Sequence, residues 1–348
     1  MERHGRPRIA RGRRQLPYHP LVPALLEVRD LAVHYADGHG GPVVAVDELS
    51  LDVPPGEVVG LLGESGCGKS TLLLAIVGLL PRSARVVNGS IRFRGRELLG
   101  LGEPELRGVR GAEVSIIFQD PALALNPVRR IGSQVAEVVQ AHRRWSGRRC
   151  RDEALSMLAE VGFPDPVRIH DSYPHELSGG QRQRVVIAQA LACRPALVLA
   201  DEPTASLDST TQAEVRGLLG ALQRRLGLAM LVVSHDLGAL ATLARRVLVM
   251  YAGRLVEAGD SARVFGDPLH PYSRGLLQAL PRAPEPGSSR ERRVPSPIPG
   301  SSPDLARLPA GCAFEPRCAD RLPACVDRPP RETRPADGRQ VRCFKYGG

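Results

Sequence analysis

The sequence contains no apolar run long enough to cross a membrane as a helix. The longest candidate spans residues 185–200 and is interrupted by Gln189, Arg194 and Pro195, whereas a membrane helix needs about 20 consecutive apolar residues. The first two dozen residues are rich in arginine, contain proline and lack the apolar segment of a secretory signal. Both absences favour a soluble chain of the cytosol, where cysteine thiols stay reduced.

Lysine is almost missing from a chain that carries a formal net charge of +10. Of its 47 lysines and arginines, only Lys69 and Lys345 are lysines. The arginines are spread along the chain, with a higher density in residues 1–14 and 143–151, and no nucleic-acid recognition motif accompanies them. We therefore expect no nucleic-acid partner. A lysine kept in such a sequence indicates a position that requires a compact ammonium group.

Lys69 belongs to a segment that matches G-x-x-x-x-G-K-[ST] at every fixed position, and that reads Gly63-Glu64-Ser65-Gly66-Cys67-Gly68-Lys69-Ser70. It follows the apolar run 58–62 and precedes a stretch with helical patterning, 71–80, which is the strand–loop–helix context that the motif requires. Backbone N–H groups of such a loop turn inward around phosphates, and the start of the helix adds positive potential. We expect Lys69 to contact the β- and γ-phosphates and the Ser70 hydroxyl to bind Mg²⁺.

Two acids follow the apolar run 197–200. Such a run suits a strand buried on both faces of a parallel sheet, and acids at its carboxyl end would face the ligand side of that sheet. We expect Asp201 to bind Mg²⁺, directly or through water, and Glu202 to be the base that polarises the attacking water.

A third motif, residues 177–184, reads LSGGQRQR and precedes another helical stretch, so it is a second potential anion site. This string resembles the signature of ABC-type ATPases, and other landmarks of that family occur in order. Tyr35 resembles the aromatic residue that stacks on adenine, and Gln119 resembles the glutamine that senses the γ-phosphate and the membrane partner. Asp208, in Ser-Leu-Asp at 206–208, resembles the loop that crosses the dimer interface, and His235 resembles the switch histidine.

The resemblance covers about residues 26–260 and implies an α/β fold: a P-loop ATPase with a RecA-like core, an antiparallel β subdomain and a helical subdomain. In this family two domains enclose two ATP molecules, each between the phosphate loop of one subunit and the signature of the other. ATP binding closes the dimer and hydrolysis opens it. The resemblance implies Glu202, His235 and Gln119 as catalytic residues, and Ser70, Gln119 and Asp201 as Mg²⁺ ligands. The nucleotide-binding residues that it implies are Tyr35, Gly63, Glu64, Ser65, Gly66, Cys67, Gly68, Lys69, Ser70, Thr71, Ser178, Gly179, Gly180, Gln181 and Asp208.

We expect three parts along the chain. Residues 1–24 form a basic, disordered tail, residues 25–260 form the ATPase domain with its helical subdomain at about 120–195, and residues 261–348 form a small Cys-rich extension. Antiparallel strands are expected within residues 25–50. Further strands are expected at 58–62, 114–118, 197–200, 229–234 and 247–250. Helices are expected at 131–140, 152–161 and 216–226.

The ATP-binding motifs do not indicate which process ATP hydrolysis drives. A DNA-linked ABC ATPase would need long coiled coils or zinc hairpins inserted in the core, and a translation-factor type usually carries two ATPase units; neither pattern is present. The energy subunit of a membrane transporter is therefore favoured, with permeases supplying the membrane spans. The stretch 264–281, around His270-Pro271-Tyr272, is similar to the segment that follows the ATPase domain in oligopeptide and dipeptide importers. Nickel importers of the same group share it.

This similarity implies an ATPase subunit of a di- or oligopeptide importer, with nickel or another small solute as the alternative cargo. It implies a paralogous ATPase as the partner, a homodimer being the alternative, together with two permease subunits and an extracytoplasmic solute-binding protein. The chain would be peripheral to the cytoplasmic face of the cell membrane, and ATP with Mg²⁺ would be its ligands.

Four of the seven cysteines lie near the end of the sequence, at Cys312, Cys318, Cys325 and Cys343. A disulfide is disfavoured in the cytosol, and the spacing does not choose between zinc and an iron–sulfur cluster, which both take four thiolates. The pattern G-C-x-F-x-x-R-C with two later cysteines resembles the C-terminal motif of the peptide importers, some of which hold a [4Fe–4S] cluster. We therefore expect such a cluster, with zinc or free buried thiols as alternatives. In the phosphate loop, the start of the helix is expected to lower the pKa of the Cys67 thiol.

Overall fold

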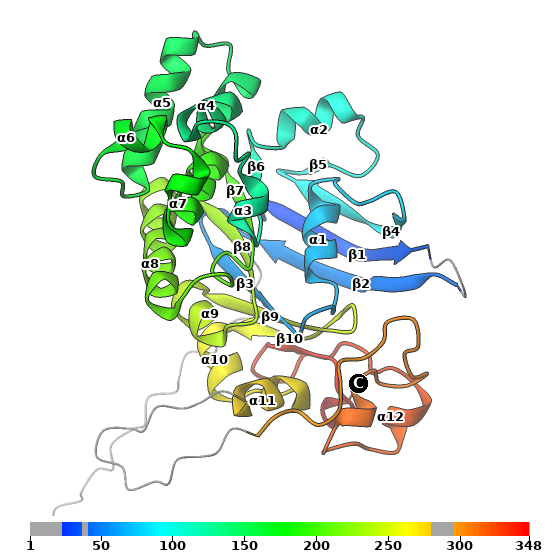
Figure 1. Ribbon diagram of the computed structural model, residues 1–348. Coiled ribbons are helices and arrows are strands. Elements are labelled where there is room, and N and C mark those ends of the chain that lie inside the picture. Colours follow the sequence, from blue (N-terminus) through cyan, green and yellow to red (C-terminus); the bar gives the residue numbers. More distant parts are fainter. Residues whose placement is uncertain (1–22, 37–40, 280–295, 348) are drawn as a thin grey trace, which may run out of the picture.

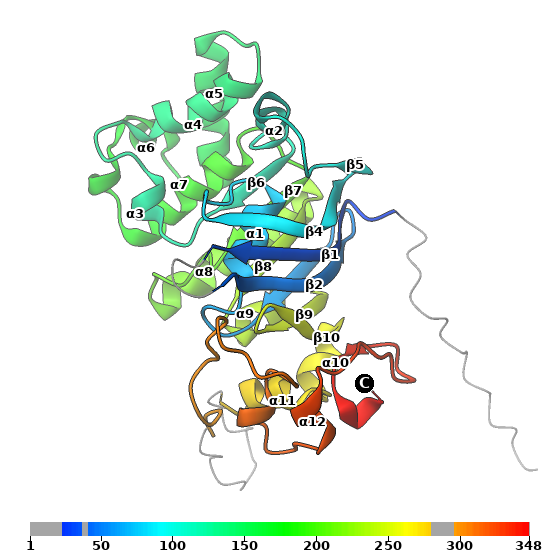
Figure 2. The same cartoon turned by 90° about the vertical axis from the view of Figure 1, so that its right-hand side faces the viewer.

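The computed structural model describes residues 23–36, 41–279 and 296–347. Figure 1 shows three regions: two sheets in the middle, a group of helices at one end, and the C-terminal part of the chain at the other. Figure 2, turned by 90°, shows the same separation. All but the last two residues of the expected basic tail lie outside the described residues.

The smaller sheet has four strands among the described residues, in the order β2-β1-β4-β5. All its pairings are antiparallel, so the antiparallel strands expected in residues 25–50 are present. At the start of β1, Leu26 and Val28 are buried whereas Glu27 and Arg29 are partly exposed, as a sheet with one face on the core requires. The strands are β1 (Leu26–Tyr35), β2 (Val43–Val53), β4 (Ala84–Phe93) and β5 (Arg96–Glu97).

The larger sheet has seven strands in the described part of the chain, in the order β11-β10-β9-β3-β8-β7-β6. The run β9-β3-β8-β7-β6 is parallel, and β10 and β11 are antiparallel additions at one edge. Every residue of β3 and β8 is buried, which explains why these strands read as continuous apolar runs. The strands are β3 (Val58–Leu62), β6 (Val114–Ile117), β7 (Leu197–Asp201), β8 (Ala229–Ser234), β9 (Arg246–Tyr251), β10 (Arg254–Asp260) and β11 (Gln340–Val341).

Helices connect these strands. Helix α1 (Lys69–Ile76) contacts β1 and β2 of the smaller sheet and β7 of the larger one, so it lies between the two sheets (Figure 1). It ends earlier than the patterning of residues 71–80 indicates, and Gly78 follows it with a φ of 63°, a conformation that glycine adopts without strain. The other helices of this part are α2 (Glu103–Val109), α8 (Ser209–Leu226) and α9 (Leu237–Leu243).

The helical region, drawn in green in Figure 1, follows β6 and precedes β7. The two helices predicted in this region are present, and each is longer than expected. The second of them starts earlier than predicted because the Ser146 hydroxyl caps its N-terminus. Buried side chains such as Ala154 and Leu158 pack it together. The elements are α3 (Pro121–Ala124), α4 (Ile131–His142), α5 (Gly147–Glu160), α6 (Pro166–Asp171), η1 (Pro174–Glu176) and α7 (Gly179–Leu191).

The C-terminal part, drawn in yellow, orange and red, packs below β9 and β10 in Figure 1. Its short elements are held by a buried ion pair between Arg339 and Glu257 of β10, and by the pairing of β11 with β10. The pairing extends the larger sheet with residues from the end of the sequence, which no sequence pattern indicated. The elements are α10 (Ser261–Gly266), α11 (Pro271–Gln278), η2 (Glu315–Arg317), α12 (Ala324–Asp327) and η3 (Phe344–Tyr346).

Candidate nucleotide-binding and catalytic site

The carboxyl ends of three neighbouring parallel strands bring the predicted motifs together. Leu62, the last residue of β3, pairs with Ser234 at the end of β8, and Asp201 at the end of β7 pairs with Val233. The phosphate loop, the two acids and His235 therefore follow strands that end at the same edge of the sheet. This is the edge at which open α/β sheets bind ligands.

The phosphate loop, residues 63–68, lies close to the backbone of one strand from each sheet. A Cβ atom on Gly68 would overlap the carbonyl oxygen of Ala45 in β2, and one on Gly63 would overlap the carbonyl oxygen of Met250 in β9. Gly68 also has a φ of 108°, which side chains rarely adopt. Glycine is thus required at both positions by the close approach of the neighbouring backbone.

Lys69 begins α1 and is buried, with 6% of its surface exposed. Its Nζ atom donates hydrogen bonds of 2.8 Å to the carbonyl oxygens of Gly63 and Glu64. The loop thus wraps around the ammonium group, which lies inside it. A guanidinium group is larger and planar, so the one lysine of the core lies where arginine would not substitute.

Cys67 corrects a prediction. The start of α1 was expected to lower the pKa of its thiol, but burial raises that pKa, and the nearby Lys69 ammonium only partly opposes the effect. The thiol is 5% exposed and its Sγ atom lies 3.9 Å from Nζ of Lys69. Cys67 is therefore a buried neutral thiol in this structure, not an activated one.

A cavity of about 620 Å³ opens beside the loop. Tyr35 forms one wall, and its hydroxyl lies 3.2 Å from Oγ1 of Thr71. The size and the lining suit a nucleotide, because an aromatic ring and the phosphate loop both border the cavity. The lining residues are Tyr35, Val43, Ala45, Ser65, Gly66, Gly68, Lys69, Ser70, Thr71, Gln119, Glu202, His235 and Leu305.

The two acids at the end of β7 have different surroundings. Burial raises the pKa of Asp201, and a hydrogen bond with Ser70 opposes this rise, so the Ser70 hydroxyl and the Asp201 carboxyl are direct neighbours. Hydroxyl and carboxylate oxygens are ligands that suit Mg²⁺. The donor set at this point therefore fits the predicted metal.

Glu202 follows with a φ of 46°. Its Oε2 atom lies 3.0 Å from Nδ1 of His235 and accepts a hydrogen bond of 3.4 Å from Nε2 of Gln119. Of the three residues predicted to be catalytic, His235 and Gln119 thus both contact the carboxylate of the third, Glu202. His235 is 62% exposed at the mouth of the cavity, whereas the Glu202 side chain is 15% exposed.

The signature residues lie elsewhere. Ser178 caps α7, its hydroxyl accepting from the Gln181 backbone at 3.3 Å, while the Gln181 side chain accepts from the Ser178 backbone at 3.0 Å. Asp208 caps α8 in a similar way, with Thr211 as the donor. No residue of 177–184, and not Asp208, belongs to the lining of the cavity in the described chain. The cavity lining does not include Gly63, Glu64, Cys67 or Asp201 either.

Four residues near the site were missed by sequence reasoning. Leu305 of the C-terminal part lines the cavity, and Arg317, Tyr272 and Ser302 contact Glu64 of the phosphate loop. The three residues that contact Glu64 are each more than 200 positions away from it, so no local pattern could have indicated these contacts.

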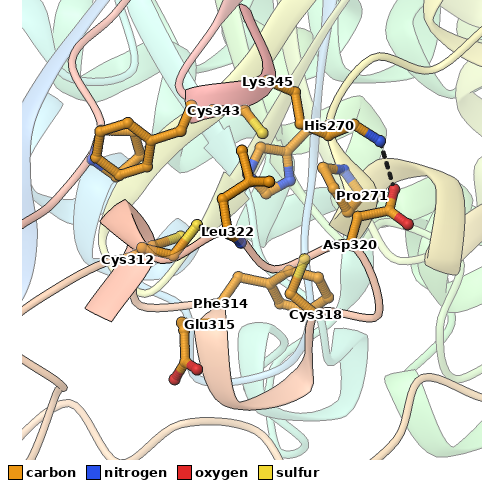
Figure 3. A pocket seen from close by; sticks show the side chains of 13 residues that line it. His270, Pro271, Cys312, Phe314, Glu315, Cys318, Asp320, Leu322, Cys343 and Lys345 are labelled. Carbon is orange, nitrogen blue, oxygen red and sulfur yellow. Dashed lines mark hydrogen bonds and ion pairs between the residues drawn. The ribbon is translucent and has the colours of Figure 1, made fainter. Parts of the chain in front are cut away.

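The four C-terminal cysteines line one small cavity of about 10 Å³, room for roughly one water molecule (Figure 3). Burial raises the pKa of Cys312 to about 11, and it also raises those of Cys318 and Cys343. Within the described residues, no group of three or more His, Cys, Asp or Glu side chains is placed to hold a metal ion. Neutral thiols around so small a space do not fit a [4Fe–4S] cluster, and the structure does not support that prediction.

Among the helices of the described residues, none is both long and apolar enough to span a bilayer. Leu123 and Val128, which follow Gln119 at the start of the helical region, are 86% and 80% exposed.

Comparisons with known proteins cover most of the chain. The family model of ABC transporters matches residues 46–205, and the model of the oligopeptide/dipeptide transporter C-terminal region matches residues 256–325. The oligopeptide transport ATP-binding protein OppD of Salmonella typhimurium is 46% identical over 92% of this chain and 93% of its own length. The dipeptide transport ATP-binding protein DppD of Bacillus subtilis is 44% identical over 92% of this chain and 94% of its own.

Among solved structures, a dimeric ATP-binding cassette in a post-hydrolysis state with ADP and phosphate superposes with a TM-score of 0.61. It is 29% identical in sequence, and the match covers 68% of this chain and 98% of that one. The fold is therefore that of the ABC ATPase cassette, as expected. With relatives this similar along nearly its whole length, the chain belongs to the family of ATP-binding subunits of oligopeptide and dipeptide ABC transporters.

Proposed function

We propose that this chain hydrolyses ATP to drive a membrane importer of di- and oligopeptides. The observation that supports this proposal most directly is the contact of Glu202 with His235 and Gln119 at the mouth of a nucleotide-sized cavity. The match of residues 256–325 to the C-terminal region of oligopeptide and dipeptide transporters supports the cargo. The importer would also contain two permease subunits and a solute-binding protein.

The proposed roles follow from position. Lys69 contacts the β- and γ-phosphates after leaving the two loop carbonyls that it now binds, and Tyr35 stacks on the adenine. Ser70, Asp201 and Gln119 would hold Mg²⁺, which neutralises phosphate charge. Glu202 accepts a proton from the attacking water while His235 holds its carboxylate in place from the exposed side.

The roles of the signature residues need a second subunit. Ser178, Gly179, Gly180 and Gln181 lie at the start of α7, outside the lining of this chain's own cavity. We propose that they bind a nucleotide held by a partner, a paralogous ATPase, with Asp208 at the interface between the two. The assembled complex would place the chain at the cytoplasmic face of the membrane.

Replacing Glu202 by glutamine tests the catalytic assignment. The change keeps the shape and the contact with His235 but removes the base, so ATP hydrolysis by the assembled transporter should fall by about 100-fold or more while ATP still binds. Glu214→Gln is the matched control, because Glu214 is an exposed acid paired with Arg184. Normal turnover of the Glu202→Gln transporter would remove Glu202 from the mechanism. Lys69→Ala should instead weaken ATP binding itself.

The cluster of Cys312, Cys318, Cys325 and Cys343 stays a separate prediction. Its support is the resemblance of the motif and the convergence of four thiols on one cavity, but the thiols would have to move apart to admit four irons. Anaerobically purified protein that is brown and contains about four iron atoms per chain would establish the cluster. Colourless protein without iron or zinc would agree with the buried free thiols described above.

A further inference from the structure

The phosphate loop contacts the C-terminal part of the chain through one residue, Glu64. Glu64, the second residue of the loop, accepts a hydrogen bond of 2.7 Å from Nη1 of Arg317 on Oε2 and one of 2.9 Å from Nη2 on Oε1. This is a bidentate pairing of guanidinium and carboxylate, the geometry in which an ion pair is strong and directional. Arg317 ends η2 and lies 253 positions along the chain from Glu64.

Arg317 is itself held in place. Its side chain is 8% exposed, its Nε atom donates to the carbonyl oxygen of Pro299 at 2.9 Å, and Nη1 also reaches the Tyr251 hydroxyl at 3.3 Å. Each nitrogen of the guanidinium group thus has a partner. A lysine could keep the charge at this position but could not make the two parallel bonds to Glu64.

Two further residues of the C-terminal part hold the same loop residue. The hydroxyl of Tyr272 in α11 accepts a hydrogen bond of 2.9 Å from the Glu64 backbone N–H, and the Ser302 hydroxyl donates to Oε2 of Glu64 at 3.0 Å. The ring of Tyr272 packs against Tyr251 and Phe314, with centroids 4.5 Å and 5.4 Å apart. Backbone and side chain of Glu64 are therefore both fixed by segments outside the ATPase motifs.

Glu64 is close to the residues that bind phosphate. Its carbonyl oxygen accepts from Nζ of Lys69, and the next residue, Ser65, lines the nucleotide cavity. A displacement of Glu64 would therefore move the backbone on which Lys69 rests and one wall of the cavity. The C-terminal part also contributes Leu305 to the lining of that cavity.

We propose that Arg317 is a positioning residue for ATP binding, which acts by clamping Glu64 so that the phosphate loop is held ready for the nucleotide. The C-terminal part of the chain then has a function in the ATP site. Removing or distorting the C-terminal part would weaken the binding of the ATP phosphates, because the pair of Arg317 and Glu64 would no longer hold the loop.

The test measures KM for ATP, kcat and the melting temperature without nucleotide, all on the transporter assembled with its partners. Arg317→Lys and Arg317→Ala should raise KM about tenfold, the change expected for the loss of one charge-assisted hydrogen bond, while kcat falls less than threefold. Arg321→Ala is the matched control, an arginine of the same segment that is 68% exposed and pairs only with Glu315 among the ion pairs of the described residues. Its KM should equal that of the unchanged protein.

A double substitution separates positioning from simple damage to the fold. Glu64→Gln alone should raise KM, and Arg317→Ala added to it should raise KM no further, because the two side chains act through one contact. Tyr272→Phe keeps the packed ring and removes only the hydroxyl that accepts from Glu64, so it should raise KM with little change in melting temperature. Unchanged KM in both Arg317 variants, or a rise from Arg317→Ala that is equally large in the Glu64→Gln background, would overturn the proposal.

Discussion

Gly68 illustrates how tightly the phosphate loop is placed at the scale of single residues. Its φ of 108° and the nearby carbonyl oxygen of Ala45 leave no room for a side chain. Gly66, two positions earlier, also has a positive φ, 79°, but nothing lies within 4 Å of where its Cβ would be. A side chain at Gly66 would therefore meet backbone strain alone, whereas one at Gly68 would meet both strain and steric overlap.

We predict that Gly68→Ala lowers the free energy of unfolding by about 2–4 kcal/mol, because it adds overlap with Ala45 to the strain of a positive φ. Gly66→Ala should cost about 1–2 kcal/mol, the strain alone. Urea denaturation of the nucleotide-free chain measures both values. Equal losses for the two substitutions would mean that the loop moves away from β2 without cost.

The pKa of Glu64 gives a second test at this scale. Burial by itself would raise it, but the hydrogen bonds from Arg317 and Ser302 outweigh burial and lower it below 4.5. Because the folded-state pKa is the lower one, the pair stabilises the folded chain above about pH 4.5, and this contribution is lost as the pH falls through the folded-state pKa. The difference in melting temperature between the unchanged chain and Arg317→Ala should therefore shrink as the pH is lowered from 6 to 3. A difference that stays constant over this range would contradict the pairing.

Strand β10 shows how one element fastens the C-terminal part to the sheet. Glu257 of β10 is fully buried, and its carboxylate accepts hydrogen bonds of 2.9 Å from the backbone N–H groups of Leu269 and His270, and of 3.4 Å from Nη1 of Arg339. Arg339 directly precedes β11, which pairs with β10. The buried charge and the added strand therefore hold the same two segments together.

Arg339→Ala should destabilise the chain by about 3–5 kcal/mol, because it leaves the Glu257 carboxylate buried without its cation. Arg107→Ala serves as the control, since Arg107 pairs with Glu103 on the surface of α2, where its side chain is 77% exposed. Surface pairs of this kind contribute little. Chemical denaturation compares the two variants, and a similar small loss in both would show that the backbone donors of Leu269 and His270 satisfy Glu257 by themselves.

At the scale of the whole molecule, the described chain holds one half of each proposed catalytic site. The phosphate loop, Glu202 and His235 share one cavity, whereas the signature at the start of α7 is not part of its lining. The fold matches a cassette that was solved as a dimer. A second subunit would supply the missing signature.

The isolated chain should therefore hydrolyse ATP slowly, and the rate per chain should rise steeply when the partner ATPase is added. Steady-state ATPase assays over a range of protein concentrations, with the oligomeric state followed by sedimentation, measure this dependence. Robust hydrolysis by a strict monomer would contradict the shared site.

Much of the site could be predicted from the sequence, because its parts are local motifs at the ends of apolar runs. Parallel strands 58–62, 197–201 and 229–234 end at one edge of a sheet, so the motifs that follow them converge. The predictions that proved wrong or lack support concern environment. The pKa of Cys67 depends on how deeply the loop is buried, and the arrangement of the four C-terminal thiols depends on how their segments pack.

The sequence by itself determined the ATPase family, the phosphate loop, the acid pair and the segment that ends at His235, since each is recognised from residue types and spacings within a few positions. Only the tertiary structure decided that β11 extends the sheet, that Leu305 enters the cavity, and that Arg317 clamps Glu64. The strand pairing and the clamp join residues more than 80 positions apart, and the energies of all three features come from burial and from paired charges. Neither is encoded in any local pattern, because both exist only once the chain has folded.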